Sequence, residues 1–149
     1  MRRDHWLGQG IYFYREDIEQ ARLWAKYKIK KYPCERPSVI EVTIRTREAN
    51  FLNLDTRSGM SSLALFIEKL EKEGLIIKIR HDNSSQEKTR CYIMSLLPDS
   101  IWIIQRTFEV KSMFDRSKYF TTMGLRLLGT QVCVRNHCVI QSDSIKSVL

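Results

Sequence analysis

The sequence has no apolar run that approaches the ~20 residues of a membrane-spanning helix. Its opening residues, Met1 to His5, lack the apolar stretch of a signal peptide. Only four cysteines occur in 149 residues, and without a secretion signal we expect reduced thiols instead of a disulfide framework. These absences exclude a membrane-spanning protein and a disulfide-rich secreted one. We therefore expect a soluble cytoplasmic protein with no membrane partner.

Internal repeats, low-complexity tracts and linker-like stretches are also absent from the sequence. A chain of 149 residues that is 43% hydrophobic can bury one substantial core. The sequence therefore predicts a single domain over residues 1–149.

Acidic residues are outnumbered, because 25 Lys and Arg stand against 17 Asp and Glu and give a net charge of +8. Such an excess favours polyanionic partners. Basic residues gather near the end of one expected helix (Lys26, Lys28, Lys30, Lys31) and in the last third of the chain (Arg116, Lys118, Arg126, Arg135). Cations at a helix C-terminus also complement the helix dipole. The charge therefore permits a nucleic-acid partner without demonstrating one.

Hydrophobic periodicity predicts a chain of mixed helices and strands. Helices are expected over 15–31, from a cap at Asp55 or Ser58 to about Glu73, and over 89–97. Strands are expected over 11–13, 40–44, 101–110 and 131–135. A long and poorly periodic connection covers 111–130. The sequence therefore predicts the α+β class.

Two glycines, Gly8 and Gly10, run directly into the apolar residues Ile11-Tyr12-Phe13, which are expected to form a short buried strand, and an amphipathic helix follows. Glycine lets the backbone approach a ligand closely and adopt φ values that other residues avoid. The alternative interpretation is a tight turn before an ordinary core strand, because a lone glycine motif is a weak signal.

The stretch Asp4 to Phe13, together with Ala21 and Trp24-Ala25, resembles the second motif of the ADP-ribosyltransferase superfamily. The resemblance is to the branch of diphtheria-toxin-like enzymes and poly-ADP-ribose polymerases, and within it to small bacterial toxin-type members. It implies a split, mostly antiparallel β-sheet whose flanking helices form a cleft for NAD.

The resemblance also implies roles for individual residues. Tyr12 matches the tyrosine that stacks on the nicotinamide of NAD, and Gly8, Gly10 and Trp24 belong to the same cofactor-binding motif. Gln131 matches the third-motif residue that bonds the nicotinamide ribose and stabilises the developing sugar cation. Arg106, a cation within an apolar strand, is expected either to face a cleft and meet the pyrophosphate, or to lie at an exposed edge.

The loop before the third motif recognises the acceptor in the resembled family, and here it carries Phe114, Arg116, Tyr119 and Phe120. Aromatic residues interleaved with cations can also bind single-stranded nucleic acid. The implied function is an NAD-dependent mono-ADP-ribosyltransferase that modifies a protein or nucleic acid, as a bacterial toxin with a possible antitoxin partner. The alternative is a shortened, non-catalytic module that binds nucleic acid or a protein through its basic face.

The first family motif, a histidine on a strand well upstream of the glycines, has no counterpart, since only seven residues precede Gly8. We therefore expect either a longer reading frame or a shortened relative whose sheet lacks its first strand. A zinc site at Cys133, His137 and Cys138 is disfavoured, because no second cysteine pair accompanies it. Core packing of the two cysteines is the expectation, with no bound metal.

Overall fold

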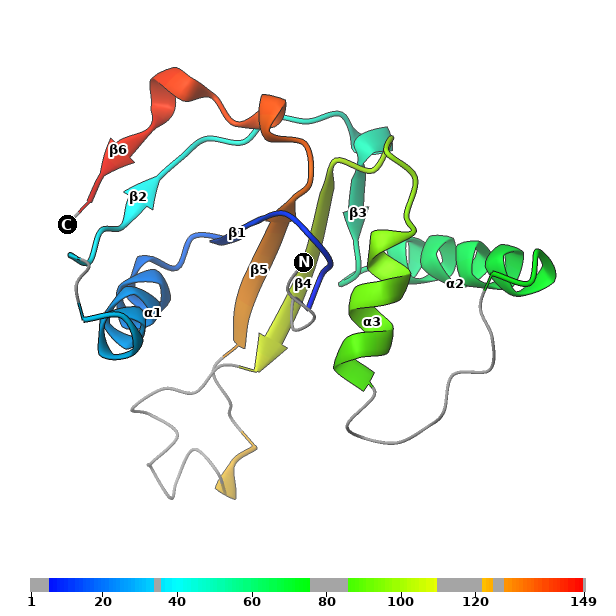
Figure 1. Cartoon of the computed structure of the whole chain (residues 1–149), viewed down its shortest axis with the longest axis horizontal. Helices are drawn as coiled ribbons and strands as arrows, with labels where there is room; N and C mark the ends of the chain where they lie inside the picture. Colours follow the sequence, from blue (N-terminus) through cyan, green and yellow to red (C-terminus); the bar gives the residue numbers. More distant parts are fainter. Residues whose placement is uncertain (1–5, 34–35, 76–85, 110–121, 125–127, 149) are drawn as a thin grey trace.

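The computed structural model describes residues 6–33, 36–75, 86–109, 122–124 and 128–148. Three helices and two small sheets make up this part of the chain, which confirms the α+β class (Figure 1). The helices are α1 (Ile18–Lys31), α2 (Arg57–Lys72) and α3 (Gln86–Ser95). The strands are β1 (Ile11–Tyr14), β2 (Ile40–Glu41), β3 (Phe51–Asn53), β4 (Ile103–Glu109), β5 (Leu128–Val134) and β6 (Lys146–Ser147).

The larger sheet has the strand order β1-β5-β4-β3, and β2 pairs with β6 in a separate two-stranded ribbon. Strand β5 runs antiparallel to both β1 and β4, whereas β3 runs parallel to β4. The sheet is therefore mixed. Register places Gln131 of β5 between Tyr14 of β1 and Arg106 of β4, because both are its directly paired neighbours.

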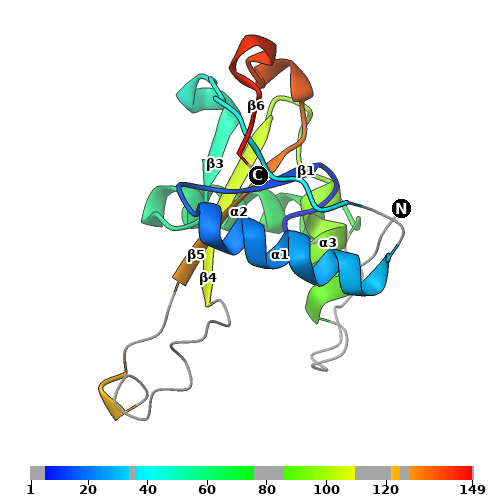
Figure 2. The ribbon, with the colours of Figure 1, turned by 90° about the vertical axis from the view of Figure 1, so that its left-hand side faces the viewer.

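The two faces of this sheet are covered by different elements. One face packs on α2 and α3 through a buried cluster that includes Leu52, Ile104 and Cys133. The other face carries Val132 and the remaining buried cluster, toward α1 and the β2–β6 ribbon. Turning the molecule by 90° places α1 in front of the sheet and α2 and α3 behind it (Figure 2).

The N-terminal elements differ from the sequence expectation in their burial. Strand β1 forms where it was predicted but lies at the edge of the sheet, so Ile11 is 49% exposed. Helix α1 starts at Ile18 and not at residue 15, because Asp17 caps it by accepting a hydrogen bond from the backbone N–H of Gln20. No residue of α1 is fully buried.

Helix α2 corrects a predicted cap. Thr56, not Asp55 or Ser58, caps the helix by accepting a hydrogen bond from the N–H of Gly59 at 3.1 Å. The periodicity of the helix predicts that it packs inward through Met60, Leu63, Ala64, Ile67 and Leu70. Leu63 and Leu70 are buried, whereas Met60 and Ala64 are exposed. The helix ends before Gly74, whose φ of 69° suits glycine.

Two strands differ from the predicted pattern. The alternation over 40–44 yields only the short strand β2, followed by an isolated bridge between Ile44 and Ile140. Strand β3 was not predicted, because its three residues gain their strand conformation from β4. In the described ranges, no helix is both long and apolar enough to cross a membrane.

Candidate functional site

The glycine turn is held in place by the side chain of Tyr12. Its hydroxyl accepts a hydrogen bond from the N–H of Leu7 and donates one to the carbonyl of Gly8, each at 2.8 Å. The half-buried ring packs against the cluster that contains Cys133. Burial, and secondarily the neighbouring Cys133 thiol, raises the pKa of Tyr12 far above its usual range. The hydroxyl therefore remains protonated and able to donate.

Both glycines of the turn are required by the packing of the chain itself. Gly8 has a φ of 86°, and a β-carbon there would lie 2.9 Å from the Cβ of Met94 in α3. At Gly10 a β-carbon would lie 2.6 Å from the carbonyl oxygen of Val134 and 2.7 Å from the sulfur of Cys133. The tight-turn interpretation therefore explains both glycines without a ligand.

Gln131 lies on the same sheet face as Tyr12, because alternate residues of β5 share a face and Tyr12 pairs with Cys133. Its side chain is half-buried. Within the described ranges, the Gln131 amide has no hydrogen-bond partner among the interactions of the chain. A half-buried amide without a partner is free to bind a ligand hydroxyl.

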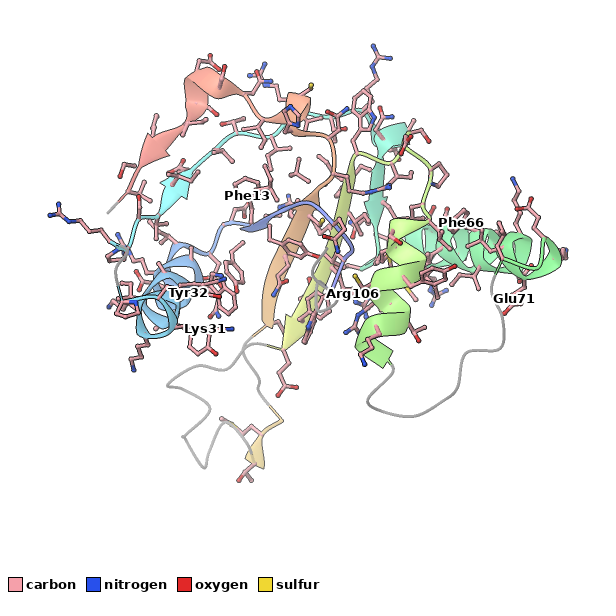
Figure 3. All side chains as sticks on the ribbon, viewed as in Figure 1. Phe13, Lys31, Tyr32, Phe66, Glu71 and Arg106 are labelled. Carbon is pink, nitrogen blue, oxygen red and sulfur yellow. The ribbon has the colours of Figure 1, made fainter. Side chains whose placement is uncertain are left out.

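Arg106 faces the same way as Gln131, on the side of the sheet next to α3 (Figure 3). The guanidinium donates a hydrogen bond to the carbonyl of Leu54 and lies 3.7 Å from the carboxylate of Asp55. Strand β4 is interior to the sheet, but its pairing with β3 ends at Gln105, one residue before Arg106. Its side chain remains 42% exposed, which leaves part of the cation open to an anion.

Asp55 connects the loop after β3 to β4. Its carboxylate accepts hydrogen bonds from the backbone N–H of Thr107 at 2.8 Å and from the Thr107 hydroxyl at 2.9 Å. The Gln105 amide adds a third bond at 3.3 Å. Burial alone would raise the pKa of Asp55, but these hydrogen bonds and the charge of Arg106 outweigh it and lower the pKa.

Three further side chains border this face and were not predicted from the sequence. Trp6 packs edge-on against Phe108, with ring centroids 4.5 Å apart, and Phe108 shares the face of Arg106. The guanidinium of Arg90 lies 4.9 Å above the Trp6 ring, and its buried Nε lacks a hydrogen bond within the described ranges. Phe108 could have been assigned to this face from the sequence, because it lies two residues after Arg106 on the same strand. No sequence signal places Arg90 there.

The remaining predicted residues lie elsewhere. Trp24 lies on α1 and is 47% exposed. Its ring contacts Tyr27 and Lys28, and no ring contact joins it to Tyr12, Gln131 or Arg106 in the described part of the chain. The predicted target-contact residues Phe114, Arg116, Tyr119 and Phe120 lie outside the described residues.

A cavity of about 720 Å³ opens on the opposite face of the sheet, between the start of α1 and the β2–β6 ribbon. Its walls are mainly apolar, with Phe13, Phe51 and Val132 among them. Gln105 is a buried polar residue in this wall. Its side-chain amide oxygen accepts a hydrogen bond from the guanidinium of Arg15 at 3.0 Å. None of the predicted NAD-binding or catalytic residues lines this cavity.

Metal binding finds no support in the described part of the chain, where no group of three His, Cys, Asp or Glu side chains can hold an ion. Cys133 is fully buried in the core, and this burial raises the pKa of its thiol to about 11. Cys138 is exposed, so the expectation of core packing is wrong for that residue. Comparisons with known protein families, with curated proteins and with solved structures found no match for this chain.

Gly10→Ala tests the close approach of β1 to β5. We expect a loss of about 1–3 kcal/mol in the free energy of unfolding, because the new methyl group meets backbone and sulfur atoms. Hydrogen exchange should show reduced protection of the β1 amides. Gly74→Ala is the control for backbone strain alone: its β-carbon meets nothing within 4 Å, but its φ of 69° disfavours alanine. It should cost some stability at the end of α2 without selectively reducing the protection of β1. A Gly10→Ala protein as stable as the parent would contradict this packing.

Asp55→Asn tests the carboxylate bridge. Because the pKa of Asp55 is lower in the folded than in the unfolded state, ionisation stabilises the fold at neutral pH. This contribution is lost as the pH falls through the folded-state pKa. The variant should be less stable at about pH 7 by about 1 kcal/mol or more, and the difference should shrink below about pH 3.9. Urea unfolding at several pH values measures this difference in stability. Asp99→Asn is the control for an exposed carboxylate. A difference that does not change with pH contradicts the assignment.

Proposed function

We propose that this protein is an ADP-ribosyltransferase-like domain that uses NAD as its substrate and transfers ADP-ribose to a macromolecule. The observation that carries the proposal is the half-buried amide of Gln131, which has no hydrogen-bond partner in the described part of the chain and shares a sheet face with Tyr12 and Arg106. These three residues come from separate parts of the sequence. Tyr12 and Gln131 match motifs of the resembled family, and Arg106 is a cation within an apolar strand.

The polar and aromatic groups on this face fit parts of NAD. The Gln131 amide can bond a ribose hydroxyl, and the partly exposed guanidinium of Arg106 can meet a pyrophosphate oxygen. Tyr12 offers a half-buried ring to the nicotinamide, although its hydroxyl is already engaged by the glycine turn. In this proposal Tyr12 therefore contributes its ring and not its hydroxyl.

Cleavage of the N-glycosidic bond of NAD requires an immobilised nicotinamide leaving group and polar groups directed at the developing sugar cation. Gln131 would hold the ribose through its amide. A neutral amide adds no negative charge, so it orients the sugar without supplying the electrostatic stabilisation of a carboxylate. This role predicts slow turnover. The cytoplasmic location, the toxin role and an antitoxin partner rest on the sequence and on the resemblance.

A non-catalytic binding module is the second candidate function. The observation that favours it is the exposed, lysine-rich end of α1, which provides a basic surface whether or not NAD is used. NAD turnover by the protein separates the two candidates.

Gln131→Ala tests the catalytic assignment. Because Gln131 acts mainly on the developing ribose cation, we expect turnover of NAD to fall about tenfold or more with little change in NAD affinity. Gln131→Glu restores a negative charge and should raise NAD glycohydrolase activity. Gln141→Ala removes the same amide group outside strand β5 and is the matched control. Normal turnover in Gln131→Ala, or no NAD hydrolysis by the parent protein, contradicts the assignment.

Tyr12 variants separate ring stacking from turn stability. Tyr12→Ala should weaken NAD binding by about 1 kcal/mol or more, through loss of aromatic stacking. Tyr12→Phe keeps the ring and should bind NAD nearly as well, yet lose about 1–2 kcal/mol of folding stability with its two backbone hydrogen bonds. Calorimetry measures the first quantity and urea unfolding the second. Unchanged NAD affinity in a folded Tyr12→Ala protein would overturn the stacking role.

A further inference from the structure

The outer face of α1 carries a stacked pair of exposed aromatic rings. Trp24 and Tyr27 lie with ring centroids 5.5 Å apart and planes inclined by 22°. Trp24 is 47% and Tyr27 56% exposed, so each of the two residues presents part of its surface to solvent. An exposed aromatic pair does nothing for the core of this protein, because α1 buries none of its residues completely.

Lysine side chains lie directly against these rings. The ammonium of Lys28 is 5.4 Å from the centroid of Trp24 and 5.7 Å from that of Tyr32. Lys31 adds a further ammonium 5.8 Å from Tyr32, and the two side chains lie together at the end of α1 (Figure 3). These distances are within the range of cation–π attraction, which holds the lysines beside the rings.

The charge of this surface is not neutralised locally. The one carboxylate of α1, Glu19, is paired with Arg22 at 2.6 Å. Within the described ranges, no carboxylate forms an ion pair with the exposed lysines (Lys26, Lys30, Lys31) or with Lys28. Complementing the helix dipole explains cations in the last turn, but it does not explain aromatic rings interleaved with them.

We propose that this surface binds single-stranded nucleic acid. It consists of Trp24, Tyr27, Tyr32 and the lysines around them. Unpaired bases can stack on the exposed parts of these rings in place of the lysine side chains, which can then contact the flanking phosphates. A duplex hides the faces of its bases, so it offers only its phosphates to this surface. Combined with the proposed ADP-ribosyl transfer, on which this step rests, such binding makes nucleic acid the macromolecule that receives ADP-ribose. The binding itself requires no NAD.

The test is fluorescence anisotropy of the full chain with a labelled oligothymidylate of about 12 nucleotides and with a duplex of equal length, both without NAD. We expect tighter binding of the single strand, and weakening with added salt. Trp24→Ala and Tyr27→Ala should each weaken single-strand binding about 5- to 100-fold, in line with the loss of one base stack. Trp24→Phe should restore most of the affinity.

Charge contributions are separated by a matched pair of lysine variants. Lys28→Gln should reduce the slope of log affinity against log salt by about 0.7, the value for one phosphate contact on a single strand. Lys72→Gln removes the same charge from the end of α2 and should change neither slope nor affinity. Circular dichroism checks that the exposed-site variants fold.

Three results overturn the proposal: no single-strand binding at low salt, equal affinity for the duplex with no effect of Trp24→Ala, or equal losses from Lys28→Gln and Lys72→Gln. The last two indicate attraction by net charge alone. Because these assays contain no NAD, a failure here leaves the NAD turnover of Gln131 variants as an independent result.

Discussion

The candidate site depends on the two hydrogen bonds that the Tyr12 hydroxyl makes with the backbone. By bonding to the backbone of both Leu7 and Gly8, this hydroxyl fixes the turn that leads into β1. This turn packs Gly8 against α3. It also places Trp6 edge-on against Phe108 at the border of the sheet face. One half-buried phenol therefore links the first strand, a helix and the aromatic border of the site. The same bonds give Tyr12 a structural role that a ligand-binding role must accommodate.

Elements with strong local patterns could be predicted from the sequence, whereas elements that depend on distant partners could not. Strands β4 and β5 and helix α2 lie close to their predicted ranges, because their apolar periodicity is set by burial. Strand β3 is too short to carry a pattern and exists through its parallel pairing with β4. Asp55 has the chemistry of a helix cap, but Thr107 engages its carboxylate and leaves Thr56 as the cap.

The candidate site was predictable residue by residue but not as an arrangement. Sequence resemblance pointed to Tyr12 and Gln131, and an unusual cation in an apolar strand pointed to Arg106. Their common face follows from register, and register depends on pairing between strands far apart in sequence. Trp6 and Arg90 meet only after folding, so neither was assigned. The sequence resemblance grouped Trp24 with Tyr12, but Trp24 lies on α1 and is 47% exposed.

The pairing of β1 with β5 has a consequence for how the chain folds. Ile11 pairs with Val134, so the first strand must wait for the last strand of its sheet before it can pair. Such non-local pairing carries a loop-closure cost and slows folding. During synthesis, N-terminal segments emerge first, so the glycine turn and its tyrosine leave the ribosome well before the strand that completes their surroundings. The candidate site therefore forms late in folding, and a nascent chain that ends before β5 carries Tyr12 without Gln131 and without the geometry of the site.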